Sequence, residues 1–153
     1  MSNYIGQVIG IARRKTKRAR METLTQGTIS NDHGLEGDFR GKPGPRQFSI
    51  LTEEGWKEAC KELSQELDWT IRRANLFIKG LDLKKTVGKQ LSIGTVTFEI
   101  TDELDPCSRM EEQVTGLKKA LTDNWRGGIL CRVISGGTIN IDDRITLEET
   151  PIS

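Results

Sequence analysis

The sequence predicts a mainly β protein: a closed or nearly closed β-barrel with a few short helices. Sixteen glycines among 153 residues, together with many β-branched residues, favour strands joined by tight turns. The predicted strands are spread along the whole chain, whereas the predicted helices are few. A closed barrel also leaves no strand edge unpaired. We expect one domain spanning residues 1–153, because domains typically hold about 100–200 residues.

The first third of the chain predicts three strands and one long loop. Residues 4–12 (YIGQVIGIA) and 19–26 (ARMETLTQ) have the composition of strands, with the basic run RRKTKR between them. Residues 30–47 are polar and rich in glycine, which predicts a long loop of the kind that is often functional in compact domains. Residues 47–51 (QFSIL) predict another short strand.

A helix is predicted to begin after Thr52. The Thr52 hydroxyl can cap its first turn, where Glu53 and Glu54 favourably meet the positive end of the helix dipole. The apolar positions then recur at helical spacing and form one stripe: Trp56, Ala59, Cys60, Leu63 and Leu67. The following residues, 70–83, are predicted to be extended and irregular.

The second half of the chain predicts hairpins and two short helices. Within residues 90–103, apolar and polar residues alternate, and Gly94 makes the turn of a hairpin. Short helices are predicted at residues 111–114 and 117–121. Residues 127–149 predict two final strands joined by a glycine turn.

Composition and charge argue against several classes of protein. The chain holds 23 Lys and Arg against 22 Asp and Glu, so it has no overall electrostatic attraction for nucleic acid or a membrane surface. No apolar run approaches the ~20 residues that a membrane helix needs, and the N-terminus lacks the pattern of a signal peptide. Three cysteines far apart in sequence favour free thiols in a reducing compartment. We therefore expect a cytoplasmic protein.

The cysteines lie in different sequence contexts, and one of them is a candidate for chemistry. Cys107 follows Asp-Pro in a polar segment and precedes Ser108 and Arg109. Ser108 and Glu111 fit a capping box, which would place Cys107 at a helix N-terminus. A helix dipole and a nearby arginine both favour a thiolate, the form that acts as nucleophile and metal ligand. The other two are expected in the core, on an apolar helix stripe and a strand: Cys60 and Cys131.

The residues alone leave the chemistry of Cys107 open. An idle, exposed thiol is the plain alternative to a working one. Structural zinc is disfavoured because it prefers four nitrogen or sulfur ligands, and no C-x-x-C spacing is present. A Cys-His pair would need His33, the sole histidine, to fold onto Cys107, and nothing specific supports this. Sulfur transfer, or ligation of a soft metal carried in by a cofactor, is also open.

Three further segments allow either a binding or a structural interpretation. Residues 34–46 hold four glycines and several basic residues, which could cradle a phosphate or simply form a tight loop that Asp38 ties to its own backbone. The segment IRRANLF brings Arg72, Arg73 and Asn75 together, which suits phosphate recognition, yet a solvated pair of arginines is equally common. For the basic run of residues 13–20, we favour a solvated hairpin over a binding surface.

The order of these segments resembles the MOSC domain, named after the C-terminal part of molybdenum cofactor sulfurase. The resemblance is carried by GLEGD, RQFSIL, RRANLF, GKQLSIG, PCSRM, WRGG and SGGTINIDD, which together cover nearly the whole chain. It implies a single β-barrel domain of the MOSC type that binds molybdenum cofactor (molybdopterin). The family cysteine falls on Cys107, where it would be a ligand of molybdenum or would carry sulfur.

The resemblance also implies cofactor-binding residues around this cysteine. An Arg-x-Asn element would contact the pterin or its phosphate, and the two residues after the cysteine would line the same pocket. An early glycine-aspartate pair matches a family loop. In this sequence the candidates are Arg73, Asn75, Ser108, Arg109, Gly37 and Asp38.

Three functions follow as hypotheses. In the first, the protein reduces N-hydroxylated compounds, with Cys107 as thiolate ligand of molybdenum and with electrons from a separate redox partner protein. In the second, Cys107 is a sulfur carrier that receives a persulfide from a cysteine desulfurase and delivers it to molybdenum cofactor or a metal–sulfur cluster. In the third, the chain is a non-catalytic binding module. Small-molecule substrates and partner proteins are expected rather than nucleic acid or membrane, and a homodimer is compatible with all three.

Overall fold

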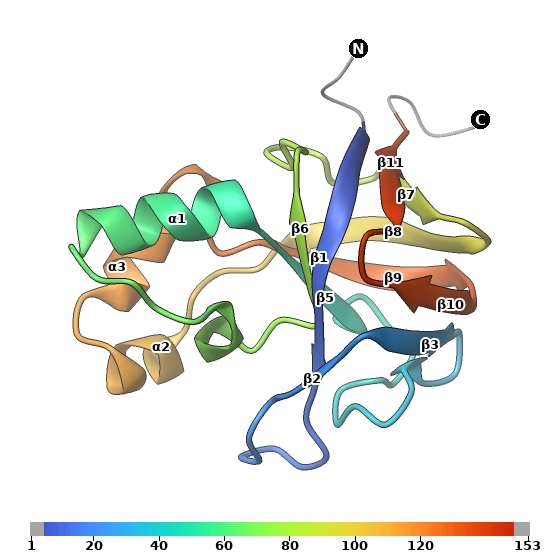
Figure 1. Cartoon of the computed structure of the whole chain (residues 1–153), viewed down its shortest axis with the longest axis horizontal. Coiled ribbons are helices and arrows are strands. Elements are labelled where there is room, and N and C mark those ends of the chain that lie inside the picture. Colours follow the sequence, from blue (N-terminus) through green and yellow to red (C-terminus); the bar gives the residue numbers. More distant parts are fainter. Residues whose placement is uncertain (1–4, 149–153) are drawn as a thin grey trace.

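A computed structural model describes residues 5–148 of the chain, and these residues form a β-barrel flanked by short helices (Figure 1). The barrel strands are β1 (Ile5–Arg13), β5 (Phe48–Thr52), β6 (Leu76–Lys79), β7 (Gln90–Ile93), β8 (Val96–Glu103), β9 (Ile129–Ser135) and β11 (Arg144–Leu147). Within the described residues these seven follow the order β11-β7-β8-β9-β5-β6-β1, and β11 pairs with β1 to close the ring. The predicted mainly β, closed barrel is confirmed.

Neighbouring barrel strands are antiparallel, with one exception. β5 and β6 run parallel, with Ile50 opposite Leu76. A parallel pair needs a crossover connection, and α1 (Glu53–Glu62) with the 3-10 helix η2 (Trp69–Arg72) supplies it. This crossover carries the chain over the outside of the barrel and brings it back at Arg73, beside the candidate site.

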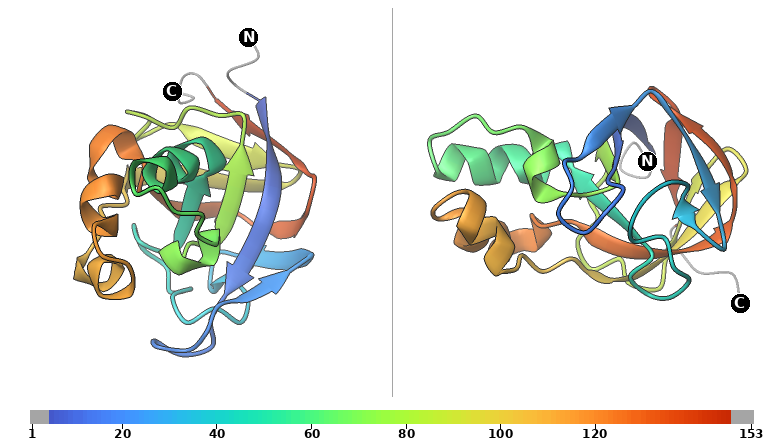
Figure 2. Two further views of the ribbon diagram at one scale, coloured as in Figure 1. Left: turned by 60° about the vertical axis from the view of Figure 1, so that its left-hand side comes forward. Right: turned by 90° about the horizontal axis from the view of Figure 1, so that it is seen from below.

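A smaller sheet packs against the barrel (Figure 2). Its strands β3 (Gln26–Ser30), β4 (Gly34–Leu35) and β10 (Gly137–Asn140) follow the order β10-β3-β4. The short strand β2 (Glu22–Leu24) belongs to the larger sheet, where it pairs antiparallel with β1. Ile29, Leu35 and Ile139 of the smaller sheet belong to the same buried cluster as the barrel interior. Phe48 and Phe98 stack at the centre of that cluster, with ring centroids 4.5 Å apart.

The helices α1, α2 (Ser108–Gln113) and α3 (Leu117–Thr122) gather on one side of the barrel, with the 3-10 helix η3 (Asp123–Trp125) following α3 (Figure 1). A second apolar cluster, which includes Trp56, Phe77 and Met110, packs them against the outer face of β5 and β6. Within residues 5–148, no helix is long and apolar enough to span a bilayer.

Several predicted elements are confirmed at nearly the predicted residues. Thr52 caps α1, and its hydroxyl oxygen accepts a hydrogen bond from the Gly55 N–H at 3.1 Å. The β7–β8 hairpin turns at Gly94, and both predicted short helices are present as α2 and α3. The outermost residues of the first and last predicted segments, Tyr4 and Glu149, lie outside the described residues.

Two element predictions were wrong, and a third was right only in part. The predicted second strand, residues 19–26, is instead split between β2 and the first residue of β3, and residues 14–21 form a loop that the Arg73 side chain holds through backbone carbonyls. Residues 70–83 are extended and irregular as predicted, with barrel strand β6 at their centre, except that residues 70–72 belong to η2. The C-terminal segment forms three strands, since the chain leaves β9 to pair as β10 with β3 and then turns into β11.

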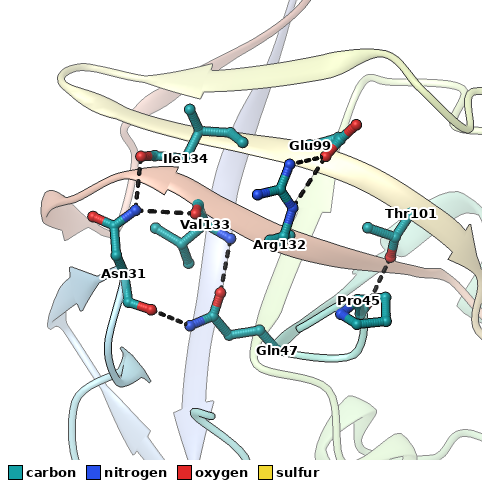
Figure 3. A network of polar contacts seen from close by, with 8 residues as sticks. All are labelled: Asn31, Pro45, Gln47, Glu99, Thr101, Arg132, Val133 and Ile134. Atoms are coloured by element: carbon teal, nitrogen blue, oxygen red, sulfur yellow. Dashed lines mark hydrogen bonds and ion pairs between the residues drawn. The ribbon is translucent and has the colours of Figure 1, made fainter. Parts of the chain in front are cut away.

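The long loop between β4 and β5 is held in place by the buried amide of Gln47 (Figure 3). Its Nε2 donates to the carbonyl oxygens of Asn31 at 2.7 Å and Gly41 at 3.1 Å, and its Oε1 accepts from the Val133 N–H at 2.9 Å. The hydroxyl of Thr101 also donates to the carbonyl of Pro45. These bonds anchor the loop to β9 and β8, and thereby fix where its charged side chains lie.

Candidate functional site

A cavity of about 360 Å³ lies where four parts of the chain meet. They are η2, the N-terminus of α2, the loop of residues 14–21 after β1, and the loop between β4 and β5. The described residues that line it include eight basic but only three acidic side chains. The basic ones are Arg14, Lys17, Arg18, Arg40, Arg46, Arg72, Arg73 and Arg109, and the acidic ones are Asp38, Asp105 and Glu112.

Cys107 lies in the wall of this cavity and its side chain is exposed. It is the N-cap residue of α2, with extended backbone and with its carbonyl accepting from the Met110 N–H at 3.0 Å. Cys60 and Cys131 are both buried, as predicted, and burial raises the pKa of the Cys131 thiol. Cys107 is therefore the one exposed thiol of the described residues.

The predicted capping box after Cys107 was wrong. Ser108 is the first residue of α2 rather than its cap, and the N-cap makes no side-chain hydrogen bond. Glu111 instead accepts hydrogen bonds from the backbone N–H groups of Gly116 at 2.8 Å and Lys118 at 3.3 Å. Its carboxylate thus serves the start of α3, whose unpaired N–H groups compete successfully with those of α2.

Arg72, which the sequence singled out only as one of the two arginines of IRRANLF, is a buried cation behind the cysteine. Its Nε donates to the Gly127 carbonyl at 3.0 Å and its Nη2 to the Leu104 carbonyl at 2.8 Å, and the side chain is 5% exposed. Burial lowers the pKa of Arg72 to about 10, and the charges of Cys107 and Asp105 oppose this change. The guanidinium remains protonated at neutral pH and places fixed positive charge beside the thiol.

Arg73 links η2 to the loop of residues 14–21, which we call the basic loop and which borders the cavity. It ends η2 in the left-handed conformation, at φ 65°, and its Nη2 donates to the carbonyls of Ala19 at 2.7 Å and Lys17 at 3.3 Å. Burial, and then the charges of Arg14, Arg109 and other arginines, lower its pKa to about 10. Its buried Nε has no hydrogen-bond partner among the described residues, so one N–H donor stays available.

Asn75 lines the cavity, but most of its hydrogen-bonding capacity is used within the fold. Its Oδ1 accepts from the N–H of Ser49 at 3.1 Å and from the Ser49 hydroxyl at 3.3 Å, and its Nδ2 donates to the Ala12 carbonyl at 3.3 Å. The side chain therefore joins β1 to β5 at the cavity floor. One amide N–H is left for a bound molecule.

Asp38 joins the two loops that border the cavity. Its carboxylate accepts from the backbone N–H of Arg14 at 3.0 Å and of Arg40 at 3.2 Å. The neighbouring Phe39 N–H donates to the Arg14 carbonyl at 2.7 Å. The predicted tie of Asp38 to its own loop is thus present, together with a second tie to the basic loop.

Six of the seven predicted site residues line the cavity, and Gly37 does not. Gly37 has φ 86°, and a Cβ atom there would lie 2.7 Å from a guanidinium nitrogen of Arg13, so tight packing explains this glycine. His33 also lies outside the lining, which leaves Cys107 without a histidine partner. The prediction missed the contribution of the basic run, which sends Arg14, Lys17 and Arg18 into the cavity instead of being wholly solvated.

A second cavity of about 430 Å³ offers different chemistry. It lies between the start of α1, the loop after β6 and the turn that contains Trp125, and no cysteine or histidine is among the described residues that line it. Residues 5–148 also hold no cluster of three or more His, Cys, Asp and Glu side chains that could bind a metal ion. The cavity at Cys107 is therefore the site to compare with known proteins.

The family model of the MOSC domain matches residues 36–146, which include Cys107 and most of the cavity. The chain belongs to the MOSC domain family. Among curated proteins, no sequence matches this chain significantly.

Solved structures of MOSC-type proteins share this fold. The YuaD protein from Bacillus subtilis is similar over 94% of this chain and 95% of its own, with a TM-score of 0.80 and 19% sequence identity. YiiM from Geobacillus stearothermophilus covers 94% of this chain and 75% of its own, with a TM-score of 0.74 and 18% identity. YiiM from Escherichia coli covers 96% and 72%, with a TM-score of 0.72 and 16% identity. Identities this low establish the fold alone.

Proposed function

We propose that this MOSC protein binds molybdenum cofactor in the cavity, with Cys107 as the thiolate ligand of molybdenum, and reduces N-hydroxylated small molecules. The observation that carries the proposal is an exposed cysteine in the wall of a cavity lined mainly by arginines. Such a cavity attracts an anionic group and keeps a soft metal ligand accessible.

The described residues fit the cofactor in three respects. The excess of basic over acidic side chains suits a pterin whose tail ends in phosphate, because arginine binds phosphate through paired N–H donors. The cavity volume of about 360 Å³ lies within the range of roughly 300–1,000 Å³ that is usual for small-molecule sites. The unpartnered Nε of Arg73 supplies a buried donor for an anionic acceptor.

Each of these residues would have a distinct role. Cys107 would hold the metal, while Arg72 keeps a positive charge behind the sulfur. Arg73, Arg109 and the neighbouring arginines would bind the phosphate tail, and Asn75 would shape the floor. When bound, the cofactor supplies two-electron oxygen-transfer chemistry, for which a separate electron-donor protein is required.

Metal and pterin content test this proposal directly. The protein is purified from a host that makes the cofactor, and molybdenum is measured by mass spectrometry and pterin by fluorescence after oxidation. Cys107→Ala should lose most of the molybdenum, whereas Cys60→Ala, which removes a buried thiol elsewhere, should retain it. Equal metal content in wild type and Cys107→Ala would show that the sulfur is not the ligand.

A matched pair of arginine variants tests the anion site. Arg18 and Arg20 are exposed residues of the same loop, but only Arg18 lines the cavity. Arg18→Ala should lower pterin content, and Arg20→Ala should leave it unchanged. If both variants behave alike, the loop contributes general charge and does not contact the cofactor.

The exposure of Cys107 also supports a second function, that of a sulfur carrier. The Cys107 thiolate would attack the outer sulfur of a persulfide on a cysteine desulfurase. The donor S–S bond would break and the donor cysteine would leave as a thiolate, so that one sulfur atom moves without net oxidation. Mass spectrometry after incubation with a desulfurase and free cysteine should then find one added sulfur on Cys107. An unmodified Cys107 in protein that holds molybdenum excludes this function in favour of the first.

A further inference from the structure

Positive charge is concentrated in one part of the chain, although the chain as a whole is nearly neutral. Residues 13–46 hold nine Lys and Arg against four Asp and Glu, out of totals of 23 and 22, so the remaining residues hold 14 against 18. This segment supplies both loops that border the cavity. The near-neutral total therefore hides a basic face around Cys107 and an acidic remainder.

Seven exposed basic side chains form what we call the basic rim. They come from the two loops that Asp38 and the Phe39 N–H join together. No ion pair or side-chain hydrogen bond with another residue of the described chain involves their charged groups. The basic rim consists of Lys15, Lys17, Arg18, Arg20, Arg40, Lys42 and Arg46.

Four members of the basic rim line the cavity, but three do not: Lys15, Arg20 and Lys42. These three cannot be explained by a ligand inside the cavity. An acidic partner of complementary charge would gain from binding such a surface.

Phe39 adds an apolar contact to the basic rim. Its side chain is 47% exposed, and the guanidinium carbon of Arg14 lies 5.8 Å from the centroid of its ring. Aromatic and arginine side chains are the residue types that dominate the energetic centre of protein–protein interfaces. An exposed phenylalanine among arginines therefore fits a protein surface better than a small anion.

We propose that the basic rim and Phe39 form the docking surface for an acidic protein, the one that exchanges electrons or sulfur with the site at Cys107. This inference rests on the proposed function, which requires such a partner. Nucleic acid fits less well, because the charges surround a hollow that contains a thiol. Single strands bind a series of stacking rings, whereas Phe39 is the one exposed Phe, Tyr or Trp among the residues that the structure describes.

An acidic peptide tests the surface without knowledge of the partner. The probe is a fluorescein-labelled peptide of glutamates with one central leucine, and binding is measured by fluorescence anisotropy at about 50 mM salt, where screening is weak. The test variant carries Lys15→Glu, Arg20→Glu and Lys42→Glu, none of which lines the cavity. The control variant makes the same change in net charge on exposed lysines outside the basic rim, with Lys84→Glu, Lys118→Glu and Lys119→Glu.

The rim variant should bind the peptide at least about tenfold more weakly than wild type, and the control variant within about twofold, because exposed charges act mainly over a Debye length. Phe39→Ala should weaken binding as well. Equal affinities of the two triple variants would overturn the proposal. Tighter binding of an oligothymidylate with the same number of charges would assign the surface to nucleic acid instead.

Cofactor content separates this inference from the proposed function. The rim variant should keep its molybdenum and pterin while losing the peptide, and Cys107→Ala should lose molybdenum while keeping the peptide. A rim variant that loses both the cofactor and peptide binding would show that the basic rim belongs to the cofactor site. That result would overturn the docking proposal but not the proposed function. If the protein binds the peptide but never holds molybdenum, the docking surface is supported and the cofactor proposal is refuted.

Discussion

Replacing Gln47 with methionine should show how much of the site depends on one buried amide. The substitution keeps the length of the side chain but removes two donors and one acceptor, which bond Asn31, Gly41 and Val133. Each buried hydrogen bond contributes about 0.5–1.5 kcal/mol net, so we expect the free energy of unfolding to fall by about 2–4 kcal/mol. At roughly 2–4 °C per kcal/mol for a domain of this size, the melting temperature should fall by roughly 4–16 °C.

Thermal and urea unfolding followed by circular dichroism measure this loss. Gln26→Met is the matched control, because Gln26 is an exposed residue at the start of β3 and its amide makes one exposed hydrogen bond, to Asn140. It should change the free energy of unfolding by less than about 1 kcal/mol, as surface substitutions usually do.

The same substitution should affect the site, since Gln47 anchors the loop that carries Asp38, Arg40 and Arg46. Limited proteolysis should cut Gln47→Met between β4 and β5 faster than wild type at a temperature where both remain folded. If Gln47→Met melts like Gln26→Met and is cut no faster, the Gln47 amide does not hold the loop, and the reasoning from Figure 3 fails.

Three further predictions concern the neighbourhood of Cys107. Arg72→Met should lower the free energy of unfolding by about 1–3 kcal/mol in chemical denaturation, because two backbone carbonyls lose a charged donor. The loss is partly offset because the variant no longer buries a charge, the burial that lowers the pKa of Arg72 to about 10. A variant more stable than wild type would show that the cost of burying the charge is the larger effect. Asp68 caps η2, and its hydrogen bonds to Thr70 lower the pKa of its carboxyl group in the folded protein. The carboxylate therefore stabilises the fold fully above pH 3.8, the ordinary pKa, and this stabilisation is lost as the pH falls through the lower pKa of the folded state. Asp68→Ala should therefore be destabilised by about 1 kcal/mol at neutral pH, and the difference from wild type should shrink as the pH falls below 3.8. A difference that is as large in acid as at neutral pH contradicts this cause. An aromatic disulfide reagent should react rapidly with one thiol per chain in the native protein and with none in Cys107→Ala. Two or more rapidly reacting thiols per chain would mean that the core cysteines are accessible.

The sequence determined the barrel because the signals for it are local. Alternating apolar residues specify which face of β8 is buried, the Thr52 hydroxyl reaches an N–H group three residues away, and Gly94 permits the hairpin turn. The polar surroundings of Cys107 likewise distinguish it from the two core cysteines. Burial patterns and short-range hydrogen bonds depend on neighbours in the chain, so residue types and spacing suffice to predict them.

Competition between hydrogen-bond partners could not be predicted locally. Glu111 fits a cap for α2 by spacing, but it bonds the start of α3 because that helix folds back within its reach. Asn75 suits phosphate binding by type, but Ser49 and Ala12 occupy most of its amide. In both cases the choice depends on which group lies nearest in space.

The family resemblance brought Arg73 and Arg109 to Cys107, but the full set of arginines around the cavity was decided by tertiary structure. Arg14, Arg40, Arg72 and Arg109 are separated by tens of residues, and a near-neutral composition conceals their convergence. The sequence alone determined a barrel and a distinct thiol. Electrostatic potential depends on distances between charges in space, so only strand pairing and loop anchoring could decide that this thiol lies among so many cations.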